Sequence, residues 1–522
     1  MKNALTTIRL TAPAVGFGAV TGAVTALVVV LYKWCAKLAV AGAEVGYHFL
    51  RGHLWCLPLV LAALGGVALL LSRVYRREPN LRGGGIPTAI GILRGQIPFR
   101  WLATLIGTFG LSLLSFLIGV PLGNEGPSVQ IGTAVGRGSV SFSKKHAAWD
   151  RYAMTGGACA GFAVATGAPI SGVLFAVEEA HRRVSPTIFV AACTSVLCAG
   201  LTNAAISPLV GVSTALFPAL SLVTLTVREA WLPLAVGAAV GLFAVAFLRY
   251  YRLLSRFFHK TLASVKSVWK IWFVLAATVA VGLFTFLGIS TGHELILSLL
   301  DGGTALWLLA VLLVLRTTLT LCANVNHITG GIFLPLLAIG ALFSALLGEG
   351  AAVLPALGRE YYSVVLMLGI TACVAGMMRM PLTAIVFAVE ALSGYGNVLY
   401  VILAAATAFT VTELFGVESI NDSVLEHRVA SLNKNAARRL IDTKVTVQAD
   451  SFAVGREIRD VFWPNGLFVL SVRSAGERRG DGLQVGDVLH VRYTTDGSTA
   501  AREALTAVVG EQEYDETEAT DE

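Results

Sequence analysis

Long apolar runs with few charges recur along the chain from residue 11 to about residue 416. A helix needs about 20 mostly apolar residues to cross a hydrocarbon core of ~30 Å. We expect the first run to be a retained helix, because no small-residue cleavage site follows it. The pattern predicts an all-α polytopic membrane domain over residues 1–430. Its clearest candidate spans are 11–32, 55–71, 231–248 and 271–289.

The pattern changes past residue 425, where apolar and polar residues alternate in short segments. VTVQ (445–448), LFVLSVR (467–473) and DVLHVRY (487–493) have the period of half-buried strands. They predict a small soluble α+β domain over 443–510 that ends in an amphipathic helix at about 498–509. We expect a linker at 431–442 and an acidic, disordered tail at 511–522.

Composition supports a membrane protein. Of the 522 residues, 55% are hydrophobic and 14% are charged, and the mean hydropathy is +0.73; soluble proteins carry roughly 25% charged residues. The net charge of +7 does not indicate a nucleic-acid partner, because the basic residues are scattered and lack interleaved aromatic residues. They fit positions that flank membrane helices.

The sequence contains no recognisable metal-binding, disulfide or catalytic motif. The seven cysteines and nine histidines show neither metal-ligand spacing nor a disulfide framework. No serine–lysine or paired-aspartate arrangement of an intramembrane enzyme occurs in the apolar runs. We therefore expect no enzyme activity, catalytic residues, metal site or cofactor.

Two pairs of segments suggest an internal repeat. PISGVLFAVE (169–178) matches the hydrophobic pattern of PLTAIVFAVE (381–390) at an offset of 212 residues. GPSVQIG (126–132) matches LPLLAIG (334–340) less closely, at an offset of 208. Transporters often consist of two inverted repeats with interrupted helices near the midplane. The sequence thus predicts this architecture.

Three glycine-rich breaks supply the interruptions. RGGGIP (82–87), GNEGP (123–127) and GGIFLP (330–335) each place glycines and then a proline at the start of an apolar run. Proline is tolerated in a first helical turn, and glycine permits close backbone approach. A helix that starts inside the membrane exposes unpaired amides and a positive dipole end, which favour an anion. The alternative for each break alone is an ordinary kink or close helix packing.

Two acids fall within this apolar part. Glu125 lies in the second break, where an intramembrane carboxylate is costly unless it is protonated or paired. At a helix N-terminus, a carboxylate can take the place of an anion, which would link proton and anion movement. For Glu179, the alternative is a salt bridge to Arg182 or Arg183, one helical turn away.

These motifs resemble, in order, those of the CLC family of chloride channels and proton-coupled anion antiporters. GGGIP resembles the family's GSGIP element, GNEGPSVQIG its GREGPxVQ element, and GGIFLP its GxFxP element. GFAVATGAPISGVLFAVEEA (161–180) resembles the helix pair between them. The resemblance implies a two-half membrane fold, a homodimer with one pore per subunit, and transport of chloride or a similar small anion. A passive anion channel is the alternative to an antiporter.

The resemblance also implies roles for individual residues. Glu125 corresponds to the external gating glutamate and Glu179 to the internal proton-transfer glutamate of antiporters. The implied anion-binding residues are Gly84, Gly85, Ile86, Asn124, Gly126, Ile332, Phe333 and Asn421.

Three of these residues depart from the family pattern. Gly84 replaces a serine, Asn421 a coordinating tyrosine, and Asn124 an arginine. We expect a roomier site that relies on backbone and amide groups. A polar residue other than arginine before the gating glutamate also resembles the fluoride-exporting branch, whereas Phe333 and Glu179 follow the chloride pattern. The sequence does not distinguish between chloride, nitrate, bicarbonate and fluoride as the transported anion.

The C-terminal segment resembles the ligand-binding subdomain of Trk/RCK regulators of potassium transport, mainly at LQVGDVL (483–489). This implies a regulatory module that pairs across a dimer and binds a small molecule; a passive assembly domain is the alternative. SGYG (393–396) is similar to a potassium filter, but it follows AVEAL without a TVG-like strand. We expect a connecting turn there. Taken together, these sequence features predict a multi-pass protein of a bacterial plasma membrane with a cytoplasmic C-terminal domain.

Overall fold

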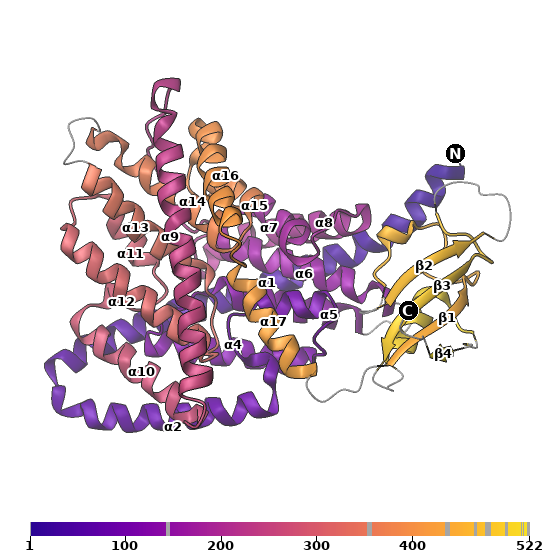
Figure 1. Cartoon of the computed structure of the whole chain (residues 1–522), viewed down its shortest axis with the longest axis horizontal. Coiled ribbons are helices and arrows are strands. Elements are labelled where there is room, and N and C mark those ends of the chain that lie inside the picture. Colours follow the sequence, from indigo (N-terminus) through magenta and orange to yellow (C-terminus); the bar gives the residue numbers. More distant parts are fainter. Residues whose placement is uncertain are drawn as a thin grey trace.

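A computed structural model describes residues 2–141, 147–351, 358–433, 439–463, 467–474, 482–495, 500–512, 514 and 516–518. Within these ranges, ten helices are long and apolar enough to cross a membrane. Figure 1 shows the helices packed together along most of the longest axis, with a small β-sheet at one end beside the N-terminus.

The expected apolar runs fall in helices. The first half contains α1 (Lys2–Gly52), α2 (Leu57–Arg77), α3 (Ile86–Leu93), α4 (Trp101–Ile118), α5 (Glu125–Ser141), α6 (Asp150–Thr166), α7 (Pro169–Phe175) and α8 (Pro186–Ile206). A π-helical turn, Ala176–Ala180, extends α7. The second half contains α9 (Trp231–Arg256), α10 (Ser267–Phe284), α11 (His293–Leu300), α12 (Leu306–Val325), α13 (Phe333–Ala351), α14 (Tyr362–Met377), α15 (Pro381–Ala391), α16 (Val398–Leu414) and α17 (Ile420–Asn433).

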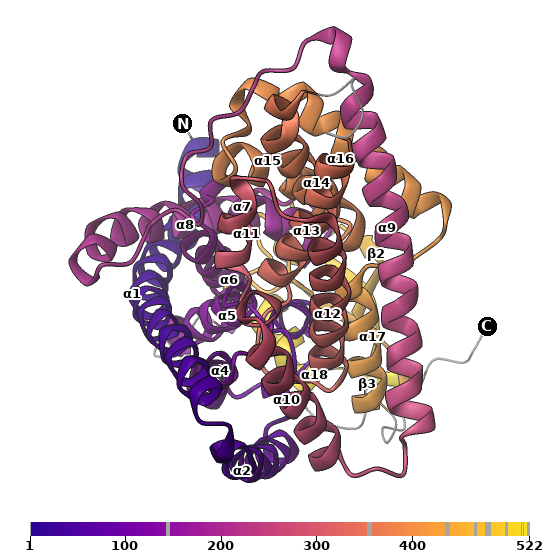
Figure 2. The ribbon, with the colours of Figure 1, turned by 90° about the vertical axis from the view of Figure 1, so that its left-hand side faces the viewer.

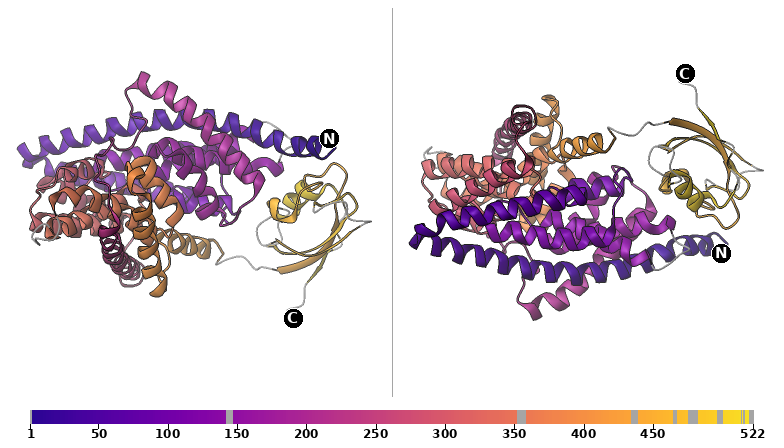
Figure 3. Two further views of the ribbon diagram at one scale, coloured as in Figure 1. Left: turned by 90° about the horizontal axis from the view of Figure 1, so that it is seen from above. Right: turned by 90° about the horizontal axis from the view of Figure 1, so that it is seen from below.

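The helices pack around apolar interiors that hold the short, interrupted helices in place. Helix α1 runs along almost the full length of the helical part and packs on α8 and α6 (Figure 3). Helix α9 flanks the opposite side, against α14 and α16 (Figure 2). Most of α5, α6 and α14 is buried. These helices are therefore surrounded by protein, whereas the long outer helices expose apolar side chains to their surroundings.

Helices α7 and α15 cap one another with carboxylates. Glu178, at the end of α7, accepts two backbone amides and the Thr383 hydroxyl at the start of α15, at 2.6–2.8 Å. Glu390, at the end of α15, accepts two amides and the Ser171 hydroxyl at the start of α7, at 2.7–2.9 Å. Each carboxylate therefore satisfies orphan donors and opposes the positive dipole end of the other helix.

The C-terminal domain is an antiparallel sheet in the order β2-β3-β1-β4, packed against α18 (Ala500–Val509). Its strands are β1 (Arg439–Thr446), β2 (Leu467–Arg473), β3 (Val488–Thr495) and β4 (Glu516–Glu518). A bulge interrupts the β2–β3 register between Val469 and Ser471. The helix corresponds to the segment expected at 498–509.

Two expected boundaries differ from the structure. Helix α17 continues to Asn433 and β1 begins at Arg439, so both enter the expected linker 431–442. The disorder expected for the tail 511–522 is wrong at 516–518, where β4 pairs with β1. A charge run predicts solvation but says nothing of backbone pairing, and charged residues are common on edge strands. Residues 519–522 lie outside the described ranges.

SGYG (393–396) lies in a connection, as expected. Ser393 adopts a left-handed conformation with φ of 57°, and a single 3-10 turn, Gly394–Asn397, leads into α16. The Tyr395 side chain is exposed. The segment thus forms a turn between α15 and α16.

Candidate functional site

The three glycine-rich breaks meet in space. Gly123 and Gly331 exchange both backbone hydrogen bonds at 2.7 Å, forming an isolated antiparallel bridge between the second and third breaks. The Gly330 amide donates to the Gly83 carbonyl at 3.4 Å, which links the third break to the first. Segments separated by more than 200 residues in the chain therefore form one structural unit.

Glycine is required where these segments touch. A side chain on Gly126 would collide with the Gly84 carbonyl oxygen, and one on Gly85 would collide with the Gly126 carbonyl group. Gly85 also has a φ of 78°, which L-residues with side chains rarely adopt. Gly85 and Gly126, expected as anion-binding residues, thus have a clear packing role at the point where α3 and α5 begin.

Three helix N-termini start at this unit: Ile86 begins α3, Glu125 begins α5 and Phe333 begins α13. The first backbone amides that donate to a carbonyl one helical turn earlier are those of Ser128 in α5 and Leu336 in α13. The preceding amides have no partner within their own helices, and proline removes one of them in each. Such ends carry positive partial charge and can bind an anion. Ile86, Ile332 and Phe333 are almost completely buried there.

Glu125 places a carboxylate at this convergence. Its side chain is completely buried and has no side-chain hydrogen-bond partner among the described residues, and the backbone amides of Glu125 and Leu334 lie beside the carboxylate. The carboxylate packs against Gly123 beside the first turn of α13, where a Cβ on Gly123 would also meet Leu334 and Pro335. A buried acid is costly in a membrane protein, so Glu125 is a candidate for a functional role.

Glu179 lies in the π-helical turn after α7 and is 1% exposed. Its Oε1 accepts a hydrogen bond of 2.9 Å from Asn421 Nδ2 on α17. The Arg94 guanidinium binds the Glu179 and Ala180 carbonyl oxygens at 2.8 and 2.9 Å, which fixes the turn but leaves the carboxylate to Asn421.

The alternative salt bridge for Glu179 is not formed in the structure. Arg182 pairs with Asp422 at 2.5 Å, and the Arg183 guanidinium lies 4.9 Å from the centre of the Phe462 ring. The amide of Asn421 is therefore the hydrogen-bond partner of the Glu179 carboxylate within the described part of the chain.

Asn124 and Asn421 occupy different surroundings. Asn124 is half-buried just before α5, where its backbone carbonyl accepts the Ser128 amide and hydroxyl at 3.0 and 2.8 Å. Asn421 is 1% exposed, and its Oδ1 has no donor among the described residues. The structure thus brings Asn421 to Glu179.

Two buried polar residues were missed by sequence reasoning. Asn324 on α12 brings its amide nitrogen to the Gly84 position. Arg316, also on α12, is completely buried and donates to the Leu287, Ile289 and Ser290 carbonyl oxygens at 2.8–3.1 Å. A charged residue inside the run LLAVLLVLRTTLTL (308–321) was the available signal; a lone asparagine gave none.

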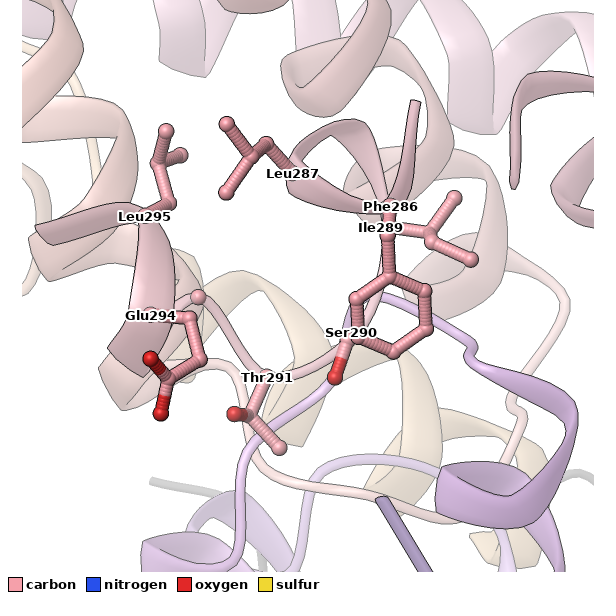
Figure 4. A pocket seen from close by; sticks show the side chains of 8 residues that line it. Phe286, Leu287, Ile289, Ser290, Thr291, Glu294 and Leu295 are labelled. Carbon is pink, nitrogen blue, oxygen red and sulfur yellow. The ribbon is translucent and has the colours of Figure 1, made fainter. Parts of the chain in front are cut away.

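The loop that Arg316 holds also lines a small cavity, drawn in Figure 4. Leu287, Leu295 and Ile289 give it mainly apolar walls, and Thr291 and Glu294 project from the segment below them. This lining differs from the unpaired backbone amides at the three helix starts. Among the described residues, no three histidine, cysteine or acidic side chains gather closely enough to hold a metal ion.

The C-terminal domain contacts the membrane domain close to Glu179. The Phe462 ring centre lies 4.5 Å from that of Tyr152 and 4.8 Å from that of His181, two residues after Glu179. Phe462 is 7% exposed and belongs to the apolar core of the membrane domain. The Tyr152 hydroxyl also donates to the Asp460 carbonyl.

Two arginines complete this contact. Arg456 is 6% exposed, and its guanidinium lies 4.0 Å from the ring centre of Phe452 and 4.9 Å from that of Trp149. Arg151 Nη1 donates to the Trp463 carbonyl at 2.7 Å. Residues 452–463, which we call the docking segment, thus join the soluble domain to α6 and to the turn that carries Glu179.

Together, the ten apolar helices within the described residues and the helices that begin at the glycine-rich breaks define a polytopic membrane protein. A family model described as voltage gated chloride channel matches residues 65–413. The chain therefore belongs to the CLC family of voltage gated chloride channel proteins.

Similar proteins carry more specific descriptions. The H(+)/Cl(-) exchange transporter ClcA of Vibrio parahaemolyticus is 30% identical over 408 residues, which cover 75% of this chain and 85% of that protein. ClcA of Salmonella typhimurium is 27% identical over 444 residues, covering 81% and 90%.

Among solved structures, a slow cyanobacterial Cl-/H+ antiporter has a TM-score of 0.74 at 25% identity, covering 81% of this chain and 99% of that one. A CLC-type fluoride/proton antiporter shares the fold, with a TM-score of 0.61 at 20% identity, covering 77% and 96%.

Proposed function

We propose that the protein is a proton-coupled anion antiporter, with chloride as the first candidate anion. The observation that carries the proposal is the completely buried Glu125 carboxylate, which has no side-chain hydrogen-bond partner among the described residues and lies beside backbone amides at converging helix N-termini. The ClcA relatives and the cyanobacterial structure are described as H+/Cl- exchangers and support the same activity.

In this mechanism, the Glu125 carboxylate competes with the anion for the helix N-termini. When the carboxylate is charged, it takes the anion's place; when it is protonated, it loses the attraction of the dipoles and releases the position. Glu179 exchanges protons on the other side of the site, through a position joined to Asn421. Gly84, Gly85, Ile86, Asn124, Gly126, Ile332, Phe333 and Asn421 are proposed to surround the anion pathway.

Purified protein in chloride-loaded liposomes tests this function. An outward chloride gradient should drive proton uptake, and Glu125→Gln should remove the proton movement while anion flux continues. Glu294→Gln is the matched control, because this side chain is 70% exposed and belongs to α11, outside the three glycine-rich breaks, so the coupling of this variant should stay unchanged. Anion flux without proton movement in the wild type would identify a passive channel. Potassium flux in place of anion flux would contradict both.

The same liposomes identify the anion. We propose chloride over fluoride because both Phe333 and Glu179 follow the chloride pattern and the ClcA relatives exchange chloride. Proton uptake driven by chloride, nitrate, bicarbonate and fluoride in turn should be fastest with chloride. A response to fluoride alone would assign the protein to the fluoride branch.

We also propose that the membrane domain consists of two inverted repeats. The two offsets in the sequence relate Gly123 to Gly331 and Glu178 to Glu390. Gly123 and Gly331 pair with one another in antiparallel fashion, and each carboxylate caps the helix that begins the other repeat element. Equivalent groups meet in this reciprocal way when a two-fold pseudo-axis passes between them.

A homodimer is proposed to form through the outer faces of α7, α8, α15 and α16. These faces expose large apolar side chains, including Ile170, Leu197, Leu382 and Leu399. The resemblance to the family supports pairing in a lipid bilayer, in a bacterial plasma membrane. Subunit counting of singly labelled protein in liposomes should give two subunits, and Leu197→Trp should shift the population toward one.

The C-terminal domain is proposed to be a cytoplasmic regulatory module like that of Trk/RCK proteins, occupying about 443–510 after a short linker, with a small-molecule ligand. Its docking segment contacts Tyr152, His181 and Arg183, so a change in the soluble domain can reach the turn that carries Glu179. A passive assembly domain is the alternative.

Phe462→Ala tests the regulatory role. Truncating a packed phenylalanine costs about 3–5 kcal/mol, enough to favour undocking. Hydrogen exchange around residues 181–183 should rise and the rate of proton-coupled flux should change. Phe468→Ala is the control, because this phenylalanine of β2 is 64% exposed. Faster hydrogen exchange with an unchanged rate of transport would show that the domain is a passive assembly domain.

A further inference from the structure

Gly84 stands where the family pattern has a serine, so the proposed anion pathway lacks a hydroxyl donor at this position. The structure shows which groups lie around it. A Cβ added to Gly84 would have three neighbours: the Gly330 carbonyl oxygen at 3.6 Å, Asn324 Nδ2 at 3.8 Å and Pro87 Cδ at 3.9 Å. The amide nitrogen of Asn324 therefore approaches the space that a larger residue at this position would use. It comes from α12, whose C-terminal end packs near the first and third breaks.

The Asn324 side chain is buried without complete hydrogen bonding. The residue is 5% exposed, and its Oδ1 has no donor among the described residues. An anion cannot satisfy this oxygen, which is an acceptor; the amide nitrogen beside Gly84 is the atom that can donate to an anion. Nearby Asn326 instead directs its Nδ2 to the Cys322 carbonyl at 2.8 Å.

A carboxamide can serve an anion as a hydroxyl does. Its NH₂ group has two N–H donors and no net charge, so it can bind an anion without the strong retention that a full positive charge gives. The Asn421 carboxamide, by contrast, donates its Nδ2 to Glu179 at 2.9 Å. Asn324 is therefore the carboxamide that approaches Gly84.

We propose that Asn324 is an anion-binding residue whose amide N–H replaces the hydroxyl donor that Gly84 lacks. This inference rests on the proposed transport function and adds a residue to it. In this arrangement, the backbone amides at the helix starts supply the fixed dipoles, while Asn324 supplies a side-chain donor from outside the three breaks.

Chloride binding to the purified, detergent-solubilised full chain tests this role by calorimetric titration. Asn324→Ala should weaken chloride binding roughly tenfold to a hundredfold, as expected for a lost hydrogen bond to a charged group. Asn326→Ala is the matched control on the same segment and should bind chloride like the wild type. Asn324→Asp keeps the side-chain volume and places a negative charge there, so it should abolish chloride binding.

A rescue experiment separates a donor from a packing role. Gly84 can accept a small side chain, because all three neighbours of its added Cβ lie at ordinary contact distances. In the Asn324→Ala background, Gly84→Ser should restore most of the chloride affinity, whereas Gly84→Ala should not. Equal rescue by serine and alanine would overturn the proposed donor.

Two results distinguish this inference from the proposed function. If Asn324→Ala and Asn324→Asp both bind chloride like the wild type while the wild type still exchanges chloride for protons, the role of Asn324 is wrong and the antiporter stands. If the wild type neither binds nor transports chloride, the proposed function with this anion fails, and the role of Asn324 fails with it.

Discussion

Asn421→Ala should change the pH at which the internal acid takes up its proton. The substitution removes the 2.9 Å hydrogen bond from Asn421 Nδ2 to Glu179 Oε1. Both side chains are 1% exposed, so water does not readily replace the lost donor. Arg94 stays bound to the backbone carbonyls of the turn, and Arg182 stays paired with Asp422. The variant therefore removes one interaction and leaves the surrounding framework intact.

The magnitude follows from the chemistry of this hydrogen bond. A hydrogen bond to a charged group contributes about 1.5–3 kcal/mol. Because about 1.4 kcal/mol corresponds to a tenfold change in an equilibrium constant, the loss is equivalent to about 1–2 pH units. The amide stabilises the charged carboxylate, so its removal favours the protonated form. The midpoint of the internal pH dependence of proton-coupled flux should therefore move to higher pH by about this amount.

The assay is proton-coupled chloride flux in oriented liposomes, with the pH varied on the side that Glu179 serves. Ser423→Ala is the matched control: it removes a hydroxyl from the same helix at similar burial, where the side chain contacts Glu418. Asn421→Asp should raise the midpoint further, because two neighbouring carboxyl groups resist ionising together. An Asn421→Ala midpoint within about 0.3 pH units of the Ser423→Ala midpoint would refute the link between Asn421 and the proton.

Three further outcomes follow from the structure. Glu178→Gln and Glu390→Gln should lower thermal stability in detergent to a similar extent, about 1–2 kcal/mol each, because each removes a charged cap; clearly unequal losses would contradict the reciprocal caps. Gly126→Ala should abolish folded expression, since its Cβ collides with backbone, whereas Gly66→Ala, with open space at its Cβ, should express normally. The Arg492 guanidinium donates to the Asp442 carboxylate and lowers the pKa of that carboxyl group. Asp442→Asn should therefore reduce the protection of β1 against hydrogen exchange by about 0.2–1 kcal/mol at pH 7. This contribution should disappear as the pH falls through the lowered pKa; a loss that persists in acid would rule out the charge.

The broken helices could be predicted from the sequence because their chemistry is local. Glycines followed by proline indicate where a helix starts, and RGGGIP, GNEGP and GGIFLP each contain the first residue of a helix in the structure. That they touch is a long-range property, and only the offset of 208 residues hinted at it. Glycine is required at position 126 because the Gly84 carbonyl packs against it, and the sequence does not show this contact.

Interactions between distant elements could not be predicted in the same way. Asn324 is one of several polar residues in a mainly apolar helix, and its nearness to Gly84 depends on how α12 packs against the first break. The docking segment contains Phe452 and Phe462, which alone would be assigned to the core of their own domain. The structure places the Phe462 side chain in the membrane-domain core instead.

The adjacent acids Glu178 and Glu179 are bound in different ways, which separates the helix cap from the proposed proton-transfer residue. Glu178 is bound by three donors at the start of α15, and it completes a helix cap. Glu179 accepts a single described donor and lies against α17. The π-helical turn Ala176–Ala180 carries both, and π turns are frequent at functional sites because they redirect side chains. Arg94 fixes the carbonyls of this turn, and His181, just after it, contacts Phe462. The turn therefore connects the helix cap, the Glu179 carboxylate and the C-terminal domain, and a perturbation of any one of these should affect the proposed proton step before it affects the proposed anion pathway at Gly84.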